Sequence, residues 1–267
     1  MTKNWSPLNR PELQVARNRA LEIIKALKIR GPEEIEIAEI AVHRGAFVQF
    51  KPLSGYLGRR IKKTITIDSN IRNLGRERFT IAHELGHYEL HNDPGRFCDN
   101  DDLYKYHNQK PKERESNAFA SEILMPSSFF KPYFQEKELT WELIEGISKI
   151  FRTSLTATAR RVVKLSMDCC VLVATEQGQI IWSRGSSSFY EANFQIVEQV
   201  HRFSYAHDLL HRYKGQSSGE CAPSAWFQGV SGEEDFTIFE DSFVLSGHNQ
   251  ILSLLSLQQP GDDDDEW

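Results

Sequence analysis

The sequence predicts an α+β protein with a first domain of helices and a small antiparallel sheet, a helix-turn-helix-like helical segment, and a second α+β domain. Apolar residues recur at helical spacing near the N-terminus and again between residues 112 and 125. Short runs that alternate like strands lie between these helices, and hairpin-like runs begin after residue 167. The predicted parts are residues 1–134, 135–166, 167–260 and an acidic, disordered tail at 261–267.

The 267-residue chain has the composition of an ordinary soluble globular protein, with 40% hydrophobic and 26% charged residues. A net charge of −5 does not favour broad binding to nucleic acid. No run is as long as a membrane span, and the N-terminus lacks the apolar core of a signal peptide. The cysteines, of which Cys169 and Cys170 are adjacent, do not form a disulfide framework. We therefore expect a cytoplasmic protein without a membrane partner.

The N-terminal part of the chain is expected to form two helices, followed by three strands. The first helix covers residues 11–29, and the second runs from Gly31-Pro32 to about His43, where Gly45 ends it. Three β-like runs follow and predict a small antiparallel sheet beside the next helix: 46–53, 55–61 and 63–68.

The stretch Thr80–Tyr88 contains an H-E-x-x-H motif. On a helix, His83 and His87 project from one face, one turn apart, so both imidazoles can reach one metal ion. Glu84 lies on the next face, close enough to act as a base on water at the metal. Apolar neighbours indicate a buried helix, in which Gly86 leaves room beside the metal.

Histidine pairs of this type usually need a third protein ligand and leave one position open for water. Residues 112–126 are expected to form a helix that Pro126 ends, and on it Glu113 and Asn117 share a face. We predict that Glu113 ligates the metal and that Asn117 orients a ligating imidazole through its free nitrogen. Glu115, which points elsewhere, is the alternative third ligand.

His91 continues the spacing of the two histidines, but on a helix it lies about 12 Å from His83. That distance is too long for one tetrahedral site, so we expect His91 to end the helix or to line the cleft. Tyr88 and Tyr56 are further candidate cleft residues. The polar segment 92–111 is expected to be a mobile loop over this cleft.

The runs F-T-I-A-H-E-L-G-H and E-R-E-S-N-A-F-A-S-E-I-L-M-P together resemble the ImmA/IrrE family of metallopeptidases, over about residues 10 to 130. The resemblance implies a zincin-like, more narrowly gluzincin-like, zinc peptidase. Known members cleave a helix-turn-helix repressor and so start a stress or mobile-element response. Where Ser116 stands the family more usually has alanine, a small change that leaves the metal ligands in place.

Residues 139–165 are expected to form a helix, a tight turn and a second helix, with Ser154 as the N-cap. Such a pair is able to read DNA, but it is also a common way to close a small helical core. The second helix carries too few basic residues to indicate DNA contact: Arg160, Arg161 and Lys164. We favour a structural role and keep direct DNA binding as the alternative.

The second α+β domain is expected to contain one long helix, over residues 189–213. Its strands are expected as a hairpin around 176–178, near Trp226, and at 236–239 and 243–245, and a short apolar element at 251–257 closes the fold. His207 and His211 are four residues apart on the predicted helix, but no further ligands accompany them, so we interpret them as surface histidines. The domain offers no catalytic constellation and is expected to sense a signal or hold a partner.

The predicted site is typical of a zinc-dependent endopeptidase. Zinc held by His83, His87 and Glu113 would activate water, and Glu84 would pass the proton of that water to the leaving amine. Manganese would accept the same ligands. The family resemblance implies the substrate, a helix-turn-helix repressor. The alternative is a DNA-binding or partner-binding regulator with a structural metal site, although a structural zinc needs no base such as Glu84.

Overall fold

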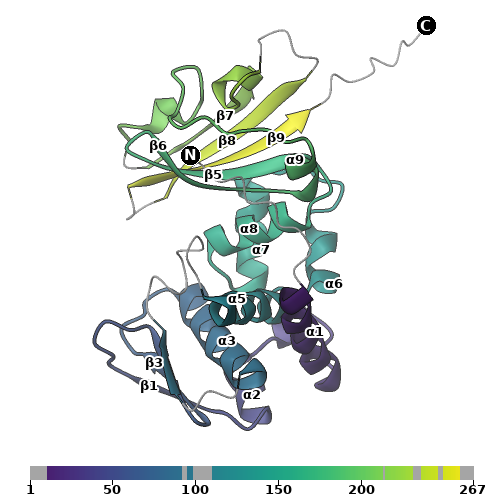
Figure 1. The fold of residues 1–267 in the computed structure, drawn as a ribbon, viewed down its shortest axis with the longest axis vertical. Coiled ribbons are helices and arrows are strands. Elements are labelled where there is room, and N and C mark those ends of the chain that lie inside the picture. The colour runs from purple at the N-terminus through teal and green to yellow at the C-terminus, as the bar shows by residue number, and fades with distance from the viewer. Residues whose placement is uncertain are drawn as a thin grey trace, which may run out of the picture. The chain divides into compact units, whose positions relative to one another are not determined.

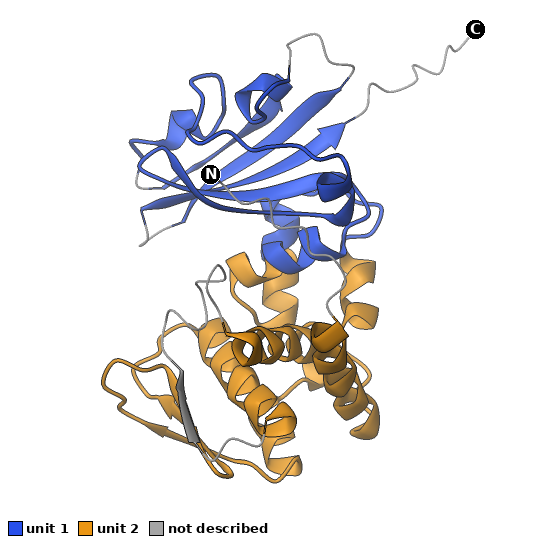
Figure 2. Cartoon of the chain, in the orientation of Figure 1, with its two compact units in different colours: residues 1–7, 134–145, 159–267 blue, residues 8–133, 146–158 orange. Residues whose placement is uncertain are grey.

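The computed structural model describes the chain with several gaps: residues 11–91, 110–212, 214–230, 236–245 and 249–258, and the backbone of 95–98. The predicted tail and most of the predicted loop 92–111 lie outside these residues. The chain divides into two compact units, drawn in orange and blue in Figure 2: unit 2 with residues 8–133 and 146–158, and unit 1 with residues 1–7, 134–145 and 159–267. The α+β class is confirmed, whereas the domain boundaries placed from the sequence stay a prediction.

The described residues of unit 2 up to Tyr133 form three long helices, α1 (Pro11–Ala26), α3 (Leu74–Leu90) and α5 (Pro111–Leu124), and two short ones, α2 (Ile37–His43) and α6 (Ser127–Phe130). Helix α5 packs against both α1 and α3 (Figure 1). Helix α3 begins where the Asn73 side chain accepts a hydrogen bond from the backbone N–H of Arg76, and α5 begins with Pro111 in its first turn. These local signals place the two helices that carry the predicted motifs.

The predicted single helix from Gly31 to His43 is interrupted. A short 3₁₀ turn covers Pro32–Glu34, and α2 begins only at Ile37. Between them the carbonyl of Ile35 accepts a hydrogen bond of 2.7 Å from the buried guanidinium of Arg78 on α3. The same carbonyl accepts a second hydrogen bond from Arg152 at 3.1 Å, so two long-range contacts stabilise the chain at this break.

The small sheet of unit 2 is mixed, so the prediction of an antiparallel sheet is wrong. Its strands are β1 (Phe47–Lys51), β2 (Gly58–Ile61), β3 (Thr64–Asp68) and β4 (Gly95–Cys98), in the order β1-β3-β2-β4. The tight turn at Lys62, with φ of 52°, makes β2 and β3 antiparallel. Strand β3 then lies between β1 and β2, and since the chain reverses at each connection, β1 and β3 run parallel. Strand β4 pairs with β2. It lies within residues 92–111, the segment that the sequence predicts to be a loop.

Helices α7 (Trp141–Phe151) and α8 (Leu155–Leu165) confirm the predicted helix, turn and helix. The hydroxyl of Ser154 accepts a hydrogen bond of 3.3 Å from the backbone N–H of Ala157, as an N-cap does. Within unit 2, the turn is held by Arg152, which pairs with Glu36 at 2.6 Å. Gly75 at the start of α3 permits this approach, because a Cβ there would stand 2.4 Å from the backbone nitrogen of Ser154.

Unit 1 is built on a five-stranded antiparallel sheet in the order β6-β5-β9-β8-β7. Its strands are β5 (Cys170–Glu176), β6 (Gln179–Gly185), β7 (Gln216–Cys221), β8 (Thr237–Leu245) and β9 (Gln250–Gln258). The predicted hairpin is present as β5 and β6. The two strands predicted at 236–239 and 243–245 are one strand, and Trp226 follows a 3₁₀ turn (Pro223–Ala225) rather than lying in a strand.

The long helix predicted over 189–213 is wrong. Among the described residues 189–212, only α9 (Ser187–Glu191) and a 3₁₀ turn (His207–Leu209) are helical. The backbone N–H groups of Tyr205 and Ala206 instead donate to the buried carboxylate of Glu240 on β8. This long-range contact fixes an irregular path that helical periodicity alone does not reveal. Among the described residues, no helix is both long and apolar enough to cross a membrane.

Candidate metal centre

Two helices of unit 2 bring three metal-ligating side chains together. His83 and His87 lie one turn apart on α3, and Glu113 lies in the first turn of α5, which packs against α3. One ligand atom from each residue falls within 4.8 Å of the others, and all three residues are buried. This is the set that helical phase predicts from the sequence.

The distances between the donor atoms fit one metal ion. His83 Nε2 lies 3.1 Å from His87 Nε2 and 3.1 Å from Glu113 Oε2, and His87 Nε2 lies 3.3 Å from Glu113 Oε1. Ligands held about 2.0 Å from a tetrahedral zinc are about 3.3 Å from one another. The three donors therefore have the spacing and the chemistry of a His-His-Glu zinc site.

The protonation states of the donors also suit a cation. Burial lowers the pKa of His87 to about 3, although its hydrogen bond with Glu113 acts in the opposite direction. Burial alone would raise the pKa of Glu113, but hydrogen bonds from His83 and His87 outweigh it and hold this pKa well below its usual range. Near neutral pH the site thus offers a neutral imidazole and an ionised carboxylate, the forms that bind metals.

Each ligating histidine has a partner at its second ring nitrogen. The Oδ1 atom of Asn117 lies 2.8 Å from His83 Nδ1, as expected for a residue that orients an imidazole. The Nδ1 atom of His91 lies 2.9 Å from His87 Nδ1. Glu115 lies outside the triad, with its carboxylate 2.9 Å from His91 Nε2. The structure therefore brings Glu113, and not Glu115, to the two histidines.

Glu84 is fully buried on α3. The strand β2 approaches it closely at Gly58, where a Cβ would stand 3.1 Å from Glu84 Oε1 and 2.7 Å from the Thr80 side chain. Gly58 thus leaves the space in which the Glu84 side chain lies. Sequence analysis missed this residue, because a glycine at the start of a predicted strand carries no signal of what lies opposite.

Gly86 leaves room for α5, whereas the space expected beside the metal stays a prediction. A Cβ there would stand 3.1 Å from both the Cα of Ser116 and the Phe119 ring on α5. The space beside Gly86 is therefore filled by α5, the helix that carries Glu113. The small pair Gly86 and Ser116 lets the two ligand-bearing helices pack closely enough to share one metal ion.

The predicted cleft tyrosines lie apart from one another. Tyr56 is 40% exposed in the connection between β1 and β2. The hydroxyl of Tyr88 lies 3.5 Å from where a Cβ of Gly45 would stand, at the end of α2. Tyr88 therefore packs toward α2, and a role of either tyrosine in the cleft stays a prediction.

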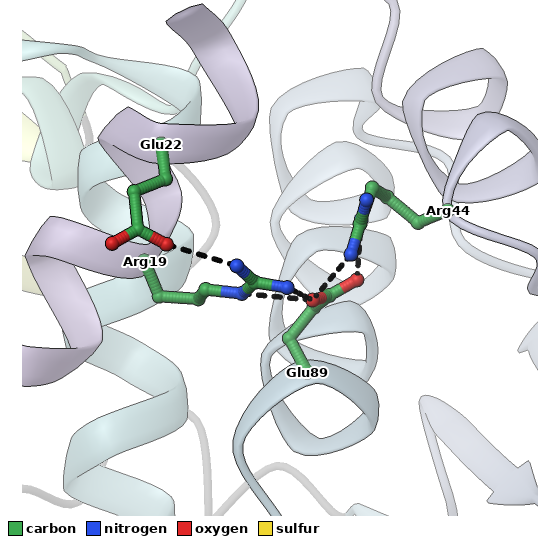
Figure 3. A network of polar contacts seen from close by, with 4 residues as sticks. All are labelled: Arg19, Glu22, Arg44 and Glu89. Carbon is green, nitrogen blue, oxygen red and sulfur yellow. Dashed lines mark hydrogen bonds and ion pairs between the residues drawn. The ribbon is translucent and has the colours of Figure 1, made fainter. Parts of the chain in front are cut away.

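The C-terminal end of α3 is fixed by the ion-pair network of Figure 3. The buried carboxylate of Glu89 accepts hydrogen bonds from Arg19 of α1 at 2.8 Å and from Arg44, which follows α2, at 2.8 Å. Arg19 also pairs with Glu22 at 2.9 Å. Two cations around one buried carboxylate join α1 and α2 to the helix that carries both histidines.

Together, the fold and the site define an α+β protein with a buried His-His-Glu centre on an H-E-x-x-H helix. Residues 34–163 match the IrrE N-terminal-like domain of the M78 peptidase family. The chain therefore carries an IrrE N-terminal-like domain over these residues, and the resemblance expected from the sequence is confirmed for them.

Solved structures extend the comparison beyond this domain. A Mycobacterium tuberculosis protein described as a transcriptional regulator is similar with a TM-score of 0.61 and 15% sequence identity, covering 93% of this chain and 76% of that one. At this identity the likeness shows the fold alone. No curated protein matches the sequence.

Proposed function

We propose that this protein is a zinc-dependent endopeptidase. The observation that carries the proposal is the buried triad of His83, His87 and Glu113, with Glu84 next to His83 on the same helix. The matching M78 peptidase domain covers all four residues. A site with three protein ligands leaves a position for water and substrate, whereas structural zinc sites are usually closed by four ligands.

Individual residues of the site would have separate roles in peptide hydrolysis. A bound zinc ion supplies a Lewis acid that lowers the pKa of water and polarises a carbonyl group. Glu84 takes a proton from the attacking water and delivers it to the leaving amine, as a general base that then acts as a general acid. Asn117 accepts a hydrogen bond from His83 Nδ1 and so keeps Nε2 of that ring directed at the metal.

The proposed substrate is a helix-turn-helix transcriptional repressor, and its cleavage would start a stress or mobile-element response in the cytoplasm. This part of the proposal is supported by the resemblance to the ImmA/IrrE family. The similar M. tuberculosis protein is described as a transcriptional regulator, which agrees with a role in transcription. Zinc is the proposed metal, with manganese as the alternative for the same donor set.

A second candidate function is a DNA-binding or partner-binding regulator whose metal site is structural. The helix pair α7 and α8 and the likeness to a transcriptional regulator favour it. The basic residues of α8 argue against DNA contact. Arg161 is 2% exposed, and the guanidinium of Arg160 lies 4.1 Å from the centre of the Trp182 ring. Only Lys164 of the three is exposed, and one cation is a weak phosphate contact.

The test compares the wild type with Glu84→Gln against a helix-turn-helix protein encoded next to this one. We expect equal zinc in both proteins and cleavage by the wild type alone. Equal zinc with no cleavage by either protein, together with salt-dependent DNA binding that survives Glu84→Gln, would favour the regulator. Cleavage by both proteins would contradict the role of Glu84.

A further inference from the structure

His91 and Glu115 form a polar chain that ends on the metal ligand His87. His91 follows the last residue of α3, and its backbone N–H still donates to the carbonyl of His87. Its Nδ1 lies 2.9 Å from His87 Nδ1, and its Nε2 lies 2.9 Å from Glu115 Oε2 on α5. The His91 side chain is 5% exposed, so these contacts are shielded from water.

The positions of the hydrogens between His87, His91 and Glu115 follow from the requirements of His87 and Glu115. His87 Nε2 faces His83 and Glu113, the position at which a metal ligand needs its lone pair, so the ring hydrogen lies on Nδ1. This N–H can donate to His91 only if His91 Nδ1 carries no hydrogen. The hydrogen of His91 then lies on Nε2, where the Glu115 carboxylate accepts it. A carboxylate cannot donate when ionised, so Glu115 fixes the direction of both hydrogen bonds.

The other ligating histidine is held in a simpler way. His83 Nδ1 meets the oxygen of Asn117, an atom that carries no hydrogen and can only accept. An imidazole such as His91 has two tautomers, and in the wrong one two N–H groups would face each other across 2.9 Å. The orientation of His87 thus depends on the tautomer of His91, and Glu115 selects that tautomer.

We propose that His91 and Glu115 are positioning residues that hold His87 in its metal-binding tautomer and orientation. The proposal rests on the metal centre of the proposed function but not on peptide cleavage. It also assigns a role to the two residues for which sequence analysis offered only a cleft position and an alternative ligand. Outer partners of ligating histidines typically contribute about 10–100-fold to metal affinity.

The test measures zinc dissociation constants by chelator competition and the visible absorption spectrum of the cobalt-substituted protein. We expect His91→Leu to weaken zinc binding about 10–100-fold and to change the cobalt spectrum, because His87 loses its acceptor. His91→Asn should recover part of the affinity, since an amide oxygen at the Nδ1 position accepts from His87. Glu115→Gln should weaken binding by about 10-fold, within the same range.

Two exposed residues of α2 give matched controls. His43→Leu makes the same side-chain change as His91→Leu, and Glu39→Gln removes the same charge as Glu115→Gln. Both controls should bind zinc like the wild type. A wild-type zinc affinity and cobalt spectrum in His91→Leu and in Glu115→Gln would overturn the proposal.

Further outcomes separate this proposal from others. If His91→Leu does not fold, Glu115→Gln decides, because Glu115 has a 23% exposed side chain and keeps its size. Equal zinc binding by His91→Leu and His91→Asn, both weakened, would also contradict the acceptor role. A wild type that binds zinc but cleaves no substrate would contradict the proposed peptidase activity. The zinc affinities of the variants would still decide whether His91 and Glu115 position His87.

Discussion

Both units bury a glutamate among polar groups, but the surroundings of the two carboxylates differ in kind. Glu240 of unit 1 accepts hydrogen bonds from Trp226 Nε1 at 2.7 Å, from Ser242 Oγ at 2.6 Å and from the backbone of Tyr205 at 3.0 Å. Burial raises its pKa in spite of these donors. Glu113 of unit 2 instead faces the ring nitrogens of His83 and His87, and its pKa is lowered.

The comparison separates a structural carboxylate from a ligating one. The donors around Glu240 come from the backbone and from side chains of several segments, so this carboxylate organises the fold of unit 1. Around Glu113 the neighbours are themselves metal ligands, and their donor atoms point into one small space. Burial of a glutamate is thus not informative by itself, whereas the identity of its neighbours is.

Replacement of each glutamate by glutamine gives the largest expected difference. Glu113→Gln should weaken zinc binding on the order of 100-fold or more, because it replaces a charged ligand. Glu240→Gln should leave zinc affinity unchanged but lower the free energy of unfolding by about 1–3 kcal/mol, since an amide NH₂ would face buried donors. Chelator competition and urea unfolding measure the two effects. Equal zinc affinities of Glu113→Gln and Glu240→Gln would contradict the assignment of Glu113 as a metal ligand and of Glu240 as a structural carboxylate.

Gly58→Ala tests whether the space beside Glu84 matters for catalysis. The added Cβ would stand 2.7 Å from the Thr80 side chain and 3.1 Å from Glu84 Oε1, so Glu84 must shift. We expect kcat to fall by about 10–100-fold with zinc content unchanged, because a small misplacement of a catalytic group is costly. Gly146→Ala is the matched control, since a Cβ there meets nothing within 4 Å. Unchanged kcat in Gly58→Ala would show that Glu84 tolerates the contact.

Glu89→Gln tests the network that fixes the end of α3. Glu89 is buried between Arg19 and Arg44, and its removal leaves two cations close together without their shared anion. Because both arginines are about one-third exposed, we expect a loss of about 1–3 kcal/mol in the free energy of unfolding rather than more. Glu22→Gln, which removes only the exposed pair with Arg19, should cost less than about 1 kcal/mol. Equal losses would show that burial of Glu89 adds nothing.

The most gradual effect is the pH dependence of the free energy of unfolding of the metal-free protein. Burial lowers the pKa of His87 to about 3, so the unfolded chain binds a proton there at pH values where the folded chain does not. The contribution of His87 is therefore complete above about pH 6.5 and is lost as pH falls toward about 3, with a slope of up to about 1.4 kcal/mol per pH unit. Urea unfolding in chelator across this range measures the slope. His87→Gln should flatten it, and an unchanged slope in this variant would contradict the assignment.

Sequence reasoning reached the triad because its residues are related by local geometry. The spacing of His83 and His87, and that of Glu113 and Asn117, is one helical turn, and a helix repeats the same way wherever it occurs. The parallel pairing of β1 with β3 and the position of β4 depend on contacts between distant segments, which periodicity does not report. The irregular chain around Tyr205 depends on Glu240, which lies 35 residues away. For the same reason, sequence analysis did not reveal the contact of Gly58 with Glu84 or that of His91 with His87.

The most direct test of the central claim is an anomalous diffraction measurement at the zinc edge on crystals grown with zinc. The account predicts one strong peak about 2.0–2.2 Å from Nε2 of His83, Nε2 of His87 and the carboxylate of Glu113. A weaker peak is expected in Glu113→Gln at a zinc concentration that only just saturates the wild type. A peak that uses Glu115 or His91 in place of Glu113, or the absence of any peak at the triad in the wild type, would contradict the metal centre and the function proposed from it.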